Sequence, residues 1–301
     1  MKIAITGATG LIGSALVPRL WAENHQIVRL VRSAPQPGQV YWNPEKGELD
    51  AASLEGIDAC IHLAGETIAG LRWTKAKKGR ILESRVKGTR LLAETLAKIQ
   101  RPPRVMLCAS AIGFYGDRGD ELLTEESAMG GGFLAEVVQA WEGAGGPAKG
   151  KTRGVNLRIG IVVSRDGGAL KPLLPLFKLG LGGRVGSGRQ YWSWVSLDDV
   201  VNAFLFALAN ERLQGPVNVT APNPVTNAAF AKALGRVLSR PAIVWTPGLL
   251  MRLLLGEAAK ELILSGARVT PAKLLANGYA FAHTDLEPAL RDILKKPAKG
   301  R

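Results

Sequence analysis

The chain alternates between two hydrophobic patterns along most of its length. Short, nearly continuous apolar runs predict buried strands at 2–5, 26–31, 58–63, 105–109, 153–163 and 216–220, with a minor strand at 40–42. Apolar positions spaced by threes and fours predict helices over 11–24, 74–99, 133–142 and 195–209, and from 226 onward. Strands that alternate with helices in this way are typical of an open α/β sheet with parallel strands. Beyond Pro241, short apolar helices alternate with proline and glycine breaks, and we expect the basic tail 295–301 to fray.

The first strand leads directly into a turn rich in glycine. The turn reads Thr6-Gly7-Ala8-Thr9-Gly10-Leu11-Ile12-Gly13 and precedes a predicted helix, which is the context of a phosphate-binding loop. Gly7 permits a backbone angle closed to other residues, Gly10 lets the main chain approach a pyrophosphate, and Gly13 lets the helix pack on the strand. Free N–H groups at the helix start would then hold the phosphate. We expect dinucleotide binding here; the alternative is a plain turn between a strand and a helix.

The end of the second predicted strand bears on the choice of cofactor. Dinucleotide-binding proteins that use NAD place an acidic residue there, against the ribose hydroxyls. This chain instead continues Val31-Arg32-Ser33, with no acid at the strand end. Because Arg32 can pair with a 2′-phosphate and Arg29 adds positive charge, we predict NADP(H) in preference to NAD(H). The alternative is that Arg32 is an ordinary surface arginine.

Two further segments have the composition of ligand sites. The strand at 58–63 ends in Ala64-Gly65-Glu66, where small residues let a nucleotide lie against the backbone. We expect His62, inside that strand, to be packed rather than catalytic. The stretch 178–194 is rich in glycine and carries two arginines. It predicts either a mobile loop beside an anionic ligand or a flexible surface hairpin.

Composition narrows the class of protein. With 301 residues, 47% of them hydrophobic and 21% charged, the chain is expected to be globular and cytoplasmic. No apolar run approaches the ~20 residues that span a bilayer, and Cys60 and Cys108 lie in apolar runs, as buried reduced thiols would. The net charge of +14 is spread along the chain, with its densest cluster at 75–80. We expect a small anionic substrate, and no metal, nucleic-acid or membrane partner; the sequence leaves the oligomeric state open.

Five motifs together resemble the extended short-chain dehydrogenase/reductase superfamily. They are TGATGLIG at 6–13, HLAGE at 62–66, SRVKGT at 84–89, SAIGFYG at 110–116 and WVSLDDVVNAFLFAL at 194–208. The stretches 178–194, 233–247 and 263–279 are similar to the NAD(P)-dependent epimerase-like family that carries a C-terminal domain of unknown function. The resemblance covers nearly the whole chain. It implies a Rossmann-type doubly wound parallel sheet (1–165 and 197–220) and a small, mostly helical C-terminal lobe over the cofactor cleft (166–196 and 221–295).

The site residues that the motifs imply fall into two groups. Cofactor contacts are expected at Gly7, Thr9, Gly10, Leu11, Ile12, Gly13, Arg32, Ser33, Leu63, Ala64, Gly65, Arg85 and Ala109. An anionic substrate is expected to contact Arg158, Arg189 and Trp194.

The chain departs from the superfamily at the acid/base residues. The superfamily combines a serine with a Tyr-x-x-x-Lys pair, whose tyrosine exchanges a proton while hydride moves at the nicotinamide. With Glu142 taken as the superfamily's acidic helix residue, the tyrosine position falls on Leu134 and the lysine position on Val138. No Tyr-x-x-x-Lys occurs anywhere in the sequence. The serine position falls on Ala111, one residue from Ser110.

Any catalysis must therefore use other groups. Our candidates are Tyr115, Ser110 and Glu66, against the alternatives of a packed aromatic for Tyr115 and a cap for Glu66. Two functions stay open at this level. One is an NADP(H)-dependent oxidoreductase or nucleotide-sugar epimerase with atypical catalytic residues. The other is a non-catalytic regulatory protein that senses NADP(H), for example a division-related factor.

Overall fold

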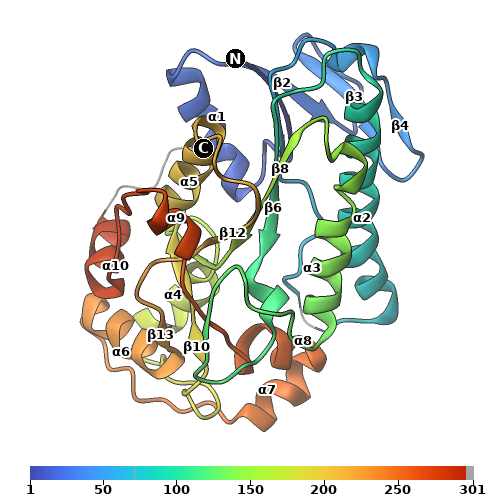
Figure 1. Cartoon of the computed structure of the whole chain (residues 1–301). Helices are drawn as coiled ribbons and strands as arrows, with labels where there is room; N and C mark the ends of the chain where they lie inside the picture. The colour runs from blue at the N-terminus through green and yellow to red at the C-terminus, as the bar shows by residue number, and fades with distance from the viewer. Residues whose placement is uncertain (71, 296–301) are drawn as a thin grey trace.

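An eight-stranded sheet forms the centre of the computed structural model, which describes residues 1–70 and 72–295 (Figure 1). The strands, in their order across the sheet, are β12 (Gly215–Val219), β8 (Arg153–Ile159), β6 (Val105–Ala111), β5 (Ala59–His62), β1 (Lys2–Thr6), β2 (Gln26–Val31), β3 (Gln39–Asn43) and β4 (Glu48–Leu49). All neighbours are parallel except β3 and β4, which are antiparallel. The predicted α/β sheet, including the minor third strand, is confirmed; the two-residue β4 was not predicted.

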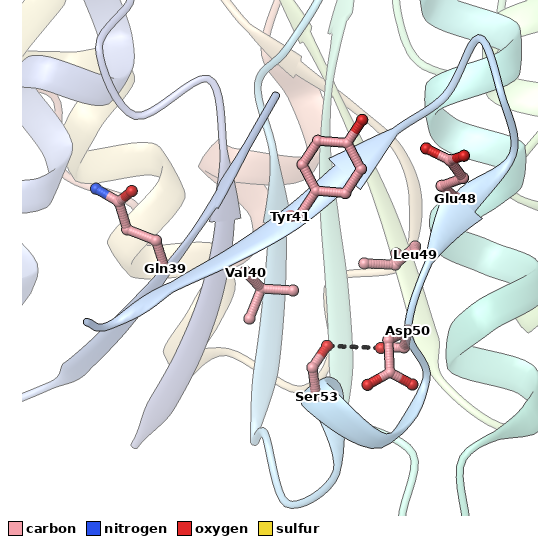
Figure 2. Close-up of a pocket in the computed structure, with 7 residues that line it drawn as sticks. All are labelled: Gln39, Val40, Tyr41, Glu48, Leu49, Asp50 and Ser53. Atoms are coloured by element: carbon pink, nitrogen blue, oxygen red, sulfur yellow. Dashed lines mark hydrogen bonds between the residues drawn. The ribbon is translucent and has the colours of Figure 1, made fainter. Parts of the chain in front are cut away.

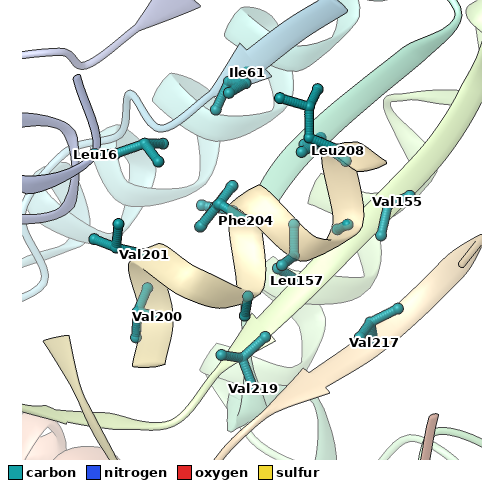
Figure 3. Close-up of a cluster of buried hydrophobic side chains, with 14 of the residues drawn as sticks. Leu16, Ile61, Val155, Leu157, Val200, Val201, Phe204, Leu208, Val217 and Val219 are labelled. Atoms are coloured by element: carbon teal, nitrogen blue, oxygen red, sulfur yellow. The ribbon is translucent and has the colours of Figure 1, made fainter. Parts of the chain in front are cut away.

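Helices cover both faces of this sheet (Figure 1). One face carries α1 (Leu11–Ala22) and α5 (Leu197–Ala209), and the other carries α2 (Lys75–Lys98) and α3 (Phe133–Gly143). Successive strand residues point to opposite faces, so Ile3 and Ile5 join the core that contains Phe204 of α5. Figure 3 shows Phe204 in this core, together with Leu16 of α1. Ala4, between them, instead joins the core around Leu92 of α2. The two cysteines are free and buried, as expected.

The order of the strands creates a crevice for a ligand. From β1 the chain moves outward to β2 and β3, then returns past β1 and builds β5, β6, β8 and β12 on the other side. The direction therefore reverses between β1 and β5. Ligands of open α/β sheets bind at such a point, outside the carboxyl ends of the strands.

One predicted strand is divided in two. The apolar run at 153–163 forms β8 in the main sheet, but beyond Gly160 it forms β9 (Ile161–Val163), which pairs with β11 (Trp194–Ser196). A Cβ atom at position 160 would lie 2.4 Å from the carbonyl oxygen of Ser193. Gly160 thus lets the chain leave the main sheet after β8. The apolar pattern of 153–163 is continuous, so it does not indicate this break.

The C-terminal lobe has its own core. Side chains of α4 (Leu170–Lys178), α6 (Asn227–Leu238) and α10 (Leu286–Lys295) meet in a second buried cluster. The lobe further contains α7 (Gly248–Leu255), α8 (Glu257–Ala259), a π-helical turn (Lys260–Leu264) and α9 (Ala272–Ala276). The expected frayed tail lies, from residue 296 on, outside the described residues. No helix of the described chain is long and apolar enough to cross a membrane.

The lobe shares one short strand pair with the core and contains another of its own. The strand β14 (Arg268–Val269) pairs with β7 (Leu122–Leu123), and β10 (Tyr191–Trp192) pairs with β13 (Val225–Thr226). The glycine-rich stretch 178–194 is held by the lobe as well. Within it, the carbonyl oxygen of Arg184 accepts a 3.0 Å hydrogen bond from Thr246, whose own carbonyl accepts from Gly186 at 2.9 Å. The stretch is thus neither a free loop nor an isolated hairpin.

Candidate functional site

The turn after β1 is tightly packed at Gly7 and Gly13 and exposed at Thr9 and Gly10. Gly7 has a φ of +68°, and a Cβ atom there would lie 2.8 Å from the backbone nitrogen of Ala64. A Cβ atom at Gly13 would lie 2.3 Å from the carbonyl oxygen of Gly7. Gly10 is the N-cap of α1 and provides no side-chain hydrogen bond. The first N–H groups of α1 are therefore left for a ligand.

The carboxyl ends of β1 and β5 are joined by one hydroxyl group. Thr6 Oγ1 accepts hydrogen bonds of 3.2 Å from the backbone N–H groups of both Leu63 and Ala64. It also lies 2.7 Å from Nδ1 of His62. Burial, with a smaller contribution from the Arg85 charge, lowers the pKa of His62 to about 3. His62 is thus a neutral, packed residue, as predicted, and it helps to hold the backbone of 63–64 in place.

Arg85 and Glu66 form the far wall of the crevice beside Gly65. The guanidinium of Arg85 donates to the carbonyl oxygen of Glu66 at 2.9 Å and lies 5.0 Å from the ring centre of Trp141. Burial lowers the pKa of Arg85 to about 10. A Cβ atom at Gly65 would be 3.4 Å from this guanidinium, so a small residue is required where the two meet.

The carboxylate of Glu66 is paired with basic residues. It accepts a 2.6 Å hydrogen bond from Lys77 and lies 3.8 Å from Arg80. The Lys77 hydrogen bond, helped by the charges of Lys77, Arg80 and Arg32, lowers the pKa of Glu66. The side chain is 34% exposed. Of the three proposed catalytic residues, Glu66 alone presents a partly exposed functional group, in its ionised form.

A second polar network lies at the end of β6. Ser110 donates to Oε1 of Glu142 at 2.6 Å, and Arg158 holds both oxygens of that carboxylate at 2.8 and 2.7 Å. Ser110 is 4% exposed and Arg158 is 3% exposed. Bidentate pairs of this kind fix both partners firmly. Arg158 therefore positions Glu142, and contact between Arg158 and a substrate stays a prediction.

Tyr115 is also placed inside the protein. Its side chain is fully buried, its hydroxyl donates to Oδ1 of Asn218 at 2.7 Å, and it accepts from Arg158 at 3.1 Å. Burial raises the pKa of Tyr115, which opposes proton loss. These placements favour the alternative, a packed aromatic, and a catalytic role for Tyr115 stays a prediction.

The other two proposed substrate contacts lie apart from each other. Trp194 is fully buried in the core of the lobe, and its indole N–H donates to the carbonyl oxygen of Asn223 at 3.1 Å. This burial does not favour contact with a ligand, and a substrate contact at Trp194 stays a prediction. Arg189 is exposed in the segment before β10, and its role stays a prediction.

The structure adds contacts from the C-terminal lobe that the sequence did not reveal. The carboxylate of Glu261 accepts a 3.2 Å hydrogen bond from the backbone N–H of Leu134, at the start of α3. Lys78 of α2 binds Glu257 at 2.9 Å. Acidic residues so far along the chain carry no local signal of these partners. The lobe thus contacts the N-terminal parts of α2 and α3.

A hollow of about 430 Å³ lies elsewhere, between β3 and β4 (Figure 2). Its lining consists of Gln39, Val40, Tyr41, Glu48, Leu49, Asp50 and Ser53. It includes no residue of the glycine turn or of the polar networks, so we place the functional site at the carboxyl edge of the sheet instead.

Comparison with known proteins matches this architecture. Residues 3–220 match the family model described as the NAD dependent epimerase/dehydratase family. The chain belongs to that family. A second model, described as a domain of unknown function (DUF1731), matches residues 246–293, within the lobe. The family is NAD(P)-dependent and has the Rossmann-like sheet found here.

Relatives in the family match over the whole chain. An epimerase family protein of Mycobacterium tuberculosis is 42% identical over 98% of this chain and 98% of its own length. The human epimerase family protein SDR39U1, solved with NADPH, is 32% identical with a TM-score of 0.91, covering 99% of this chain and 100% of that one. A nucleoside-diphosphate sugar epimerase from Corynebacterium glutamicum is 37% identical with a TM-score of 0.80, covering 98% of this chain and 58% of that one.

Proposed function

We propose that the protein binds NADP(H) at the carboxyl edge of its sheet and is an oxidoreductase or epimerase acting on a small anionic substrate. The observation that carries the proposal is the glycine turn, where Cβ atoms at Gly7 and Gly13 would meet backbone atoms at 2.8 and 2.3 Å. A turn with these constraints is suited to main-chain contact with a pyrophosphate. The human relative that was solved with NADPH supports the same choice.

The preference for NADP(H) rests on the end of β2. Arg32 and Ser33 are exposed there, and the next acidic residue in the sequence is Glu45. A guanidinium binds a phosphate through several donors at once. Arg32 would therefore favour the 2′-phosphate of NADP(H), while nothing at this strand end offers a carboxylate to the ribose hydroxyls of NAD(H).

At the nicotinamide end of the proposed cofactor site, Ser110 is our candidate for the group that exchanges a proton. The superfamily resemblance puts tyrosine and lysine where this chain has Leu134 and Val138, and Val138 is only 2% exposed among apolar neighbours. Neither can exchange a proton. When bound, the nicotinamide supplies or accepts hydride. Ser110 is only 4% exposed, but it lies at the carboxyl end of β6. A substrate bound there would have to reach its hydroxyl, which would exchange the proton while bonded to the carboxylate of Glu142.

Binding of NADPH and NADH to Arg32 variants tests the cofactor assignment. We expect Arg32→Glu to weaken NADPH binding at least about tenfold, from the loss of a charge-assisted pair, and to leave NADH binding nearly unchanged. Arg19→Glu, an exposed arginine on α1, is the matched control. Equal affinity of the wild type for both cofactors would refute the preference.

Hydride transfer tests the reaction. The protein would be incubated with a metabolite extract and NADPH deuterated at either face of nicotinamide C4, and the products read by mass spectrometry. We expect deuterium in a defined product, absent with Ser110→Ala and retained with Tyr115→Phe. Tight NADPH binding without label transfer would instead favour either an epimerase that returns hydride internally or the second candidate function.

That second candidate is a regulatory NADP(H)-binding protein. It is favoured by the apolar side chains of Leu134 and Val138 and by the contact of Glu261 with the start of α3. Cofactor bound beside that contact would change how the lobe sits on the core. Protection of the lobe from proteolysis by NADPH, in a protein without label transfer, would support it.

A further inference from the structure

Exposed large hydrophobic side chains gather in one region of the surface. Of the 14 among the described residues, 10 lie in two segments, 176–181 and 243–254. They are Leu176, Leu179, Leu181, Ile243, Val244, Trp245, Leu249, Leu250, Leu253 and Leu254, and together we name them the α7 face. Every residue of α7 itself is at least partly exposed. Contiguous apolar surface of this kind marks an interaction site.

The two segments form a single surface. The carbonyl oxygen of Gly182 accepts a 3.2 Å hydrogen bond from Val244, and Val185 forms a bridge with Thr246. Nearby, the guanidinium of Arg240 donates to the carbonyl oxygen of Lys178 at 3.0 Å. Figure 1 shows α7 at the lower end of the molecule, away from β2, β3 and β4.

The sequence stretches that carry the α7 face are basic, although Glu257 and Glu261 follow α7 directly. The sequence contains no Asp or Glu in 167–197 or in 212–256, the stretches that carry the face. Those stretches hold nine basic residues: Lys171, Lys178, Arg184, Arg189, Arg212, Lys232, Arg236, Arg240 and Arg252. Among the described ion pairs, only Arg236 of the nine takes part, with Glu287. The other eight basic residues of these stretches take part in none of the described ion pairs.

The combination of apolar surface and basic residues favours one binding partner of the α7 face over another. A second copy of the chain packed face to face would bring two basic surrounds together, which is unfavourable. A membrane surface with anionic lipids fits both properties, since leucine and tryptophan enter the boundary of the acyl chains while arginine and lysine meet the headgroups. Trp245 lies 6.0 Å from the Arg184 guanidinium, so an interfacial aromatic and a basic group are neighbours.

We propose that the α7 face docks on the surface of an anionic lipid bilayer. A hollow of about 390 Å³ adjoins the face and is lined by Lys232, Arg236, Arg240 and Ile243 among others, which provides a place for a headgroup phosphate. The proposal departs from the expectation of no membrane partner. That expectation rested on the lack of a spanning segment, and surface binding needs none.

Co-sedimentation with lipid vesicles tests the proposal. We expect the full-length protein to sediment with vesicles of phosphatidylcholine and phosphatidylglycerol, to stay in solution with phosphatidylcholine alone, and to be released by salt. The double variant Leu249→Gln with Leu253→Gln should lose about tenfold in affinity. Leu122→Gln with Leu275→Gln, two exposed leucines elsewhere, should bind like the wild type.

Charge variants test how much the basic residues contribute to vesicle binding. Arg240→Glu with Arg252→Glu should weaken binding about tenfold or more, whereas Lys46→Glu with Lys98→Glu, both exposed elsewhere, should change it little. Circular dichroism would confirm that each variant is folded. Equal sedimentation with both kinds of vesicle would overturn the proposal. So would the absence of vesicle binding together with a dimer that the Leu249 and Leu253 changes dissociate, because the α7 face would then be a contact between two copies.

Discussion

Glu261 of the C-terminal lobe caps a helix of the Rossmann core through Leu134, whose backbone N–H lies 3.2 Å from Oε2. The same carboxylate lies against Gly132, where a Cβ atom would come within 2.7 Å of Oε1. Gly132, the N-cap of α3, has no side chain with which to cap the helix. The lobe therefore supplies what the local sequence lacks, and the two parts of the molecule stabilise each other at this point.

Removing that carboxylate should destabilise the fold. We expect Glu261→Ala to lower the free energy of unfolding by about 1 kcal/mol, the usual cost of a lost helix cap, and Glu261→Gln to lower it less because the amide oxygen still accepts. Urea unfolding measures both. Glu257→Gln, which alters the exposed pair with Lys78, is the control and should change stability little. An Ala variant as stable as the wild type would show that the cap contributes nothing.

The glycine turn should tolerate no side chain at position 13. Because its Cβ would lie 2.3 Å from a backbone oxygen, Gly13→Ala must displace the turn, and we expect a loss of about 1–3 kcal/mol in stability together with loss of NADPH binding. Gly79→Ala is the matched control in α2, where the nearest atom to a new Cβ is 3.9 Å away. That change should stabilise the helix by up to about 1 kcal/mol. Retained NADPH binding in Gly13→Ala would contradict the role we give the turn.

Tyr115→Phe should act on stability rather than on the cofactor. The change removes the hydroxyl that donates to Asn218 and accepts from Arg158, and leaves a buried amide oxygen without its donor. We expect the free energy of unfolding to fall by about 1–3 kcal/mol, with NADPH affinity unchanged. Thermal or urea unfolding and a fluorescence titration measure the two quantities. A normal stability with lost turnover would support Tyr115 as a catalytic residue.

His62 should make the fold sensitive to acid. The unfolded chain binds a proton at this histidine near its ordinary pKa of 6.5, whereas burial holds the folded pKa near 3. Protonation therefore favours the unfolded state between these values: the contribution is complete above pH 6.5 and is lost as the pH falls toward 3. The expected slope is at most ~1.4 kcal/mol per pH unit.

His62→Gln should remove this slope from the pH dependence of unfolding measured between pH 6.5 and 4. The variant has a lower stability at neutral pH, because the contact with Thr6 is altered. His25→Gln, at a less buried histidine, should leave the slope unchanged. Parallel curves for the wild type and His62→Gln would show that this residue does not titrate between the two states.

Features that depend on neighbours in the sequence were predictable. The cap residues Ser196 and Thr226, at the starts of two predicted helices, accept hydrogen bonds from the N–H groups of Asp199 and Ala229. The glycine turn and the strands of the sheet likewise follow from local patterns. Features that depend on distant partners were not predictable. The hydrogen-bond partner of the buried Tyr115 hydroxyl is Asn218, 103 positions away. The sequence around either residue does not distinguish a packed phenol from a catalytic one.

The polar network at β6 shows the same limit. The sequence assigned Arg158 to a substrate because an arginine in a strand next to the crevice has the right charge. Its actual partner, Glu142, comes from α3, and the pairing depends on how that helix lies on the sheet. The charge of a residue indicates what it can bind. Which partner it meets depends on how the helices and strands pack against each other.

The composition of the lobe's core also determines when that core can fold during synthesis of the chain. That core joins Val163, in the middle of the chain, to Ile293 near its end. The strands of the main sheet are all present once residue 219 has been made, but α4 and α6 then still lack the helix that covers them. A nascent chain without α10 thus exposes apolar surface until residue 293 has been made, and this interval is when it most needs protection from aggregation.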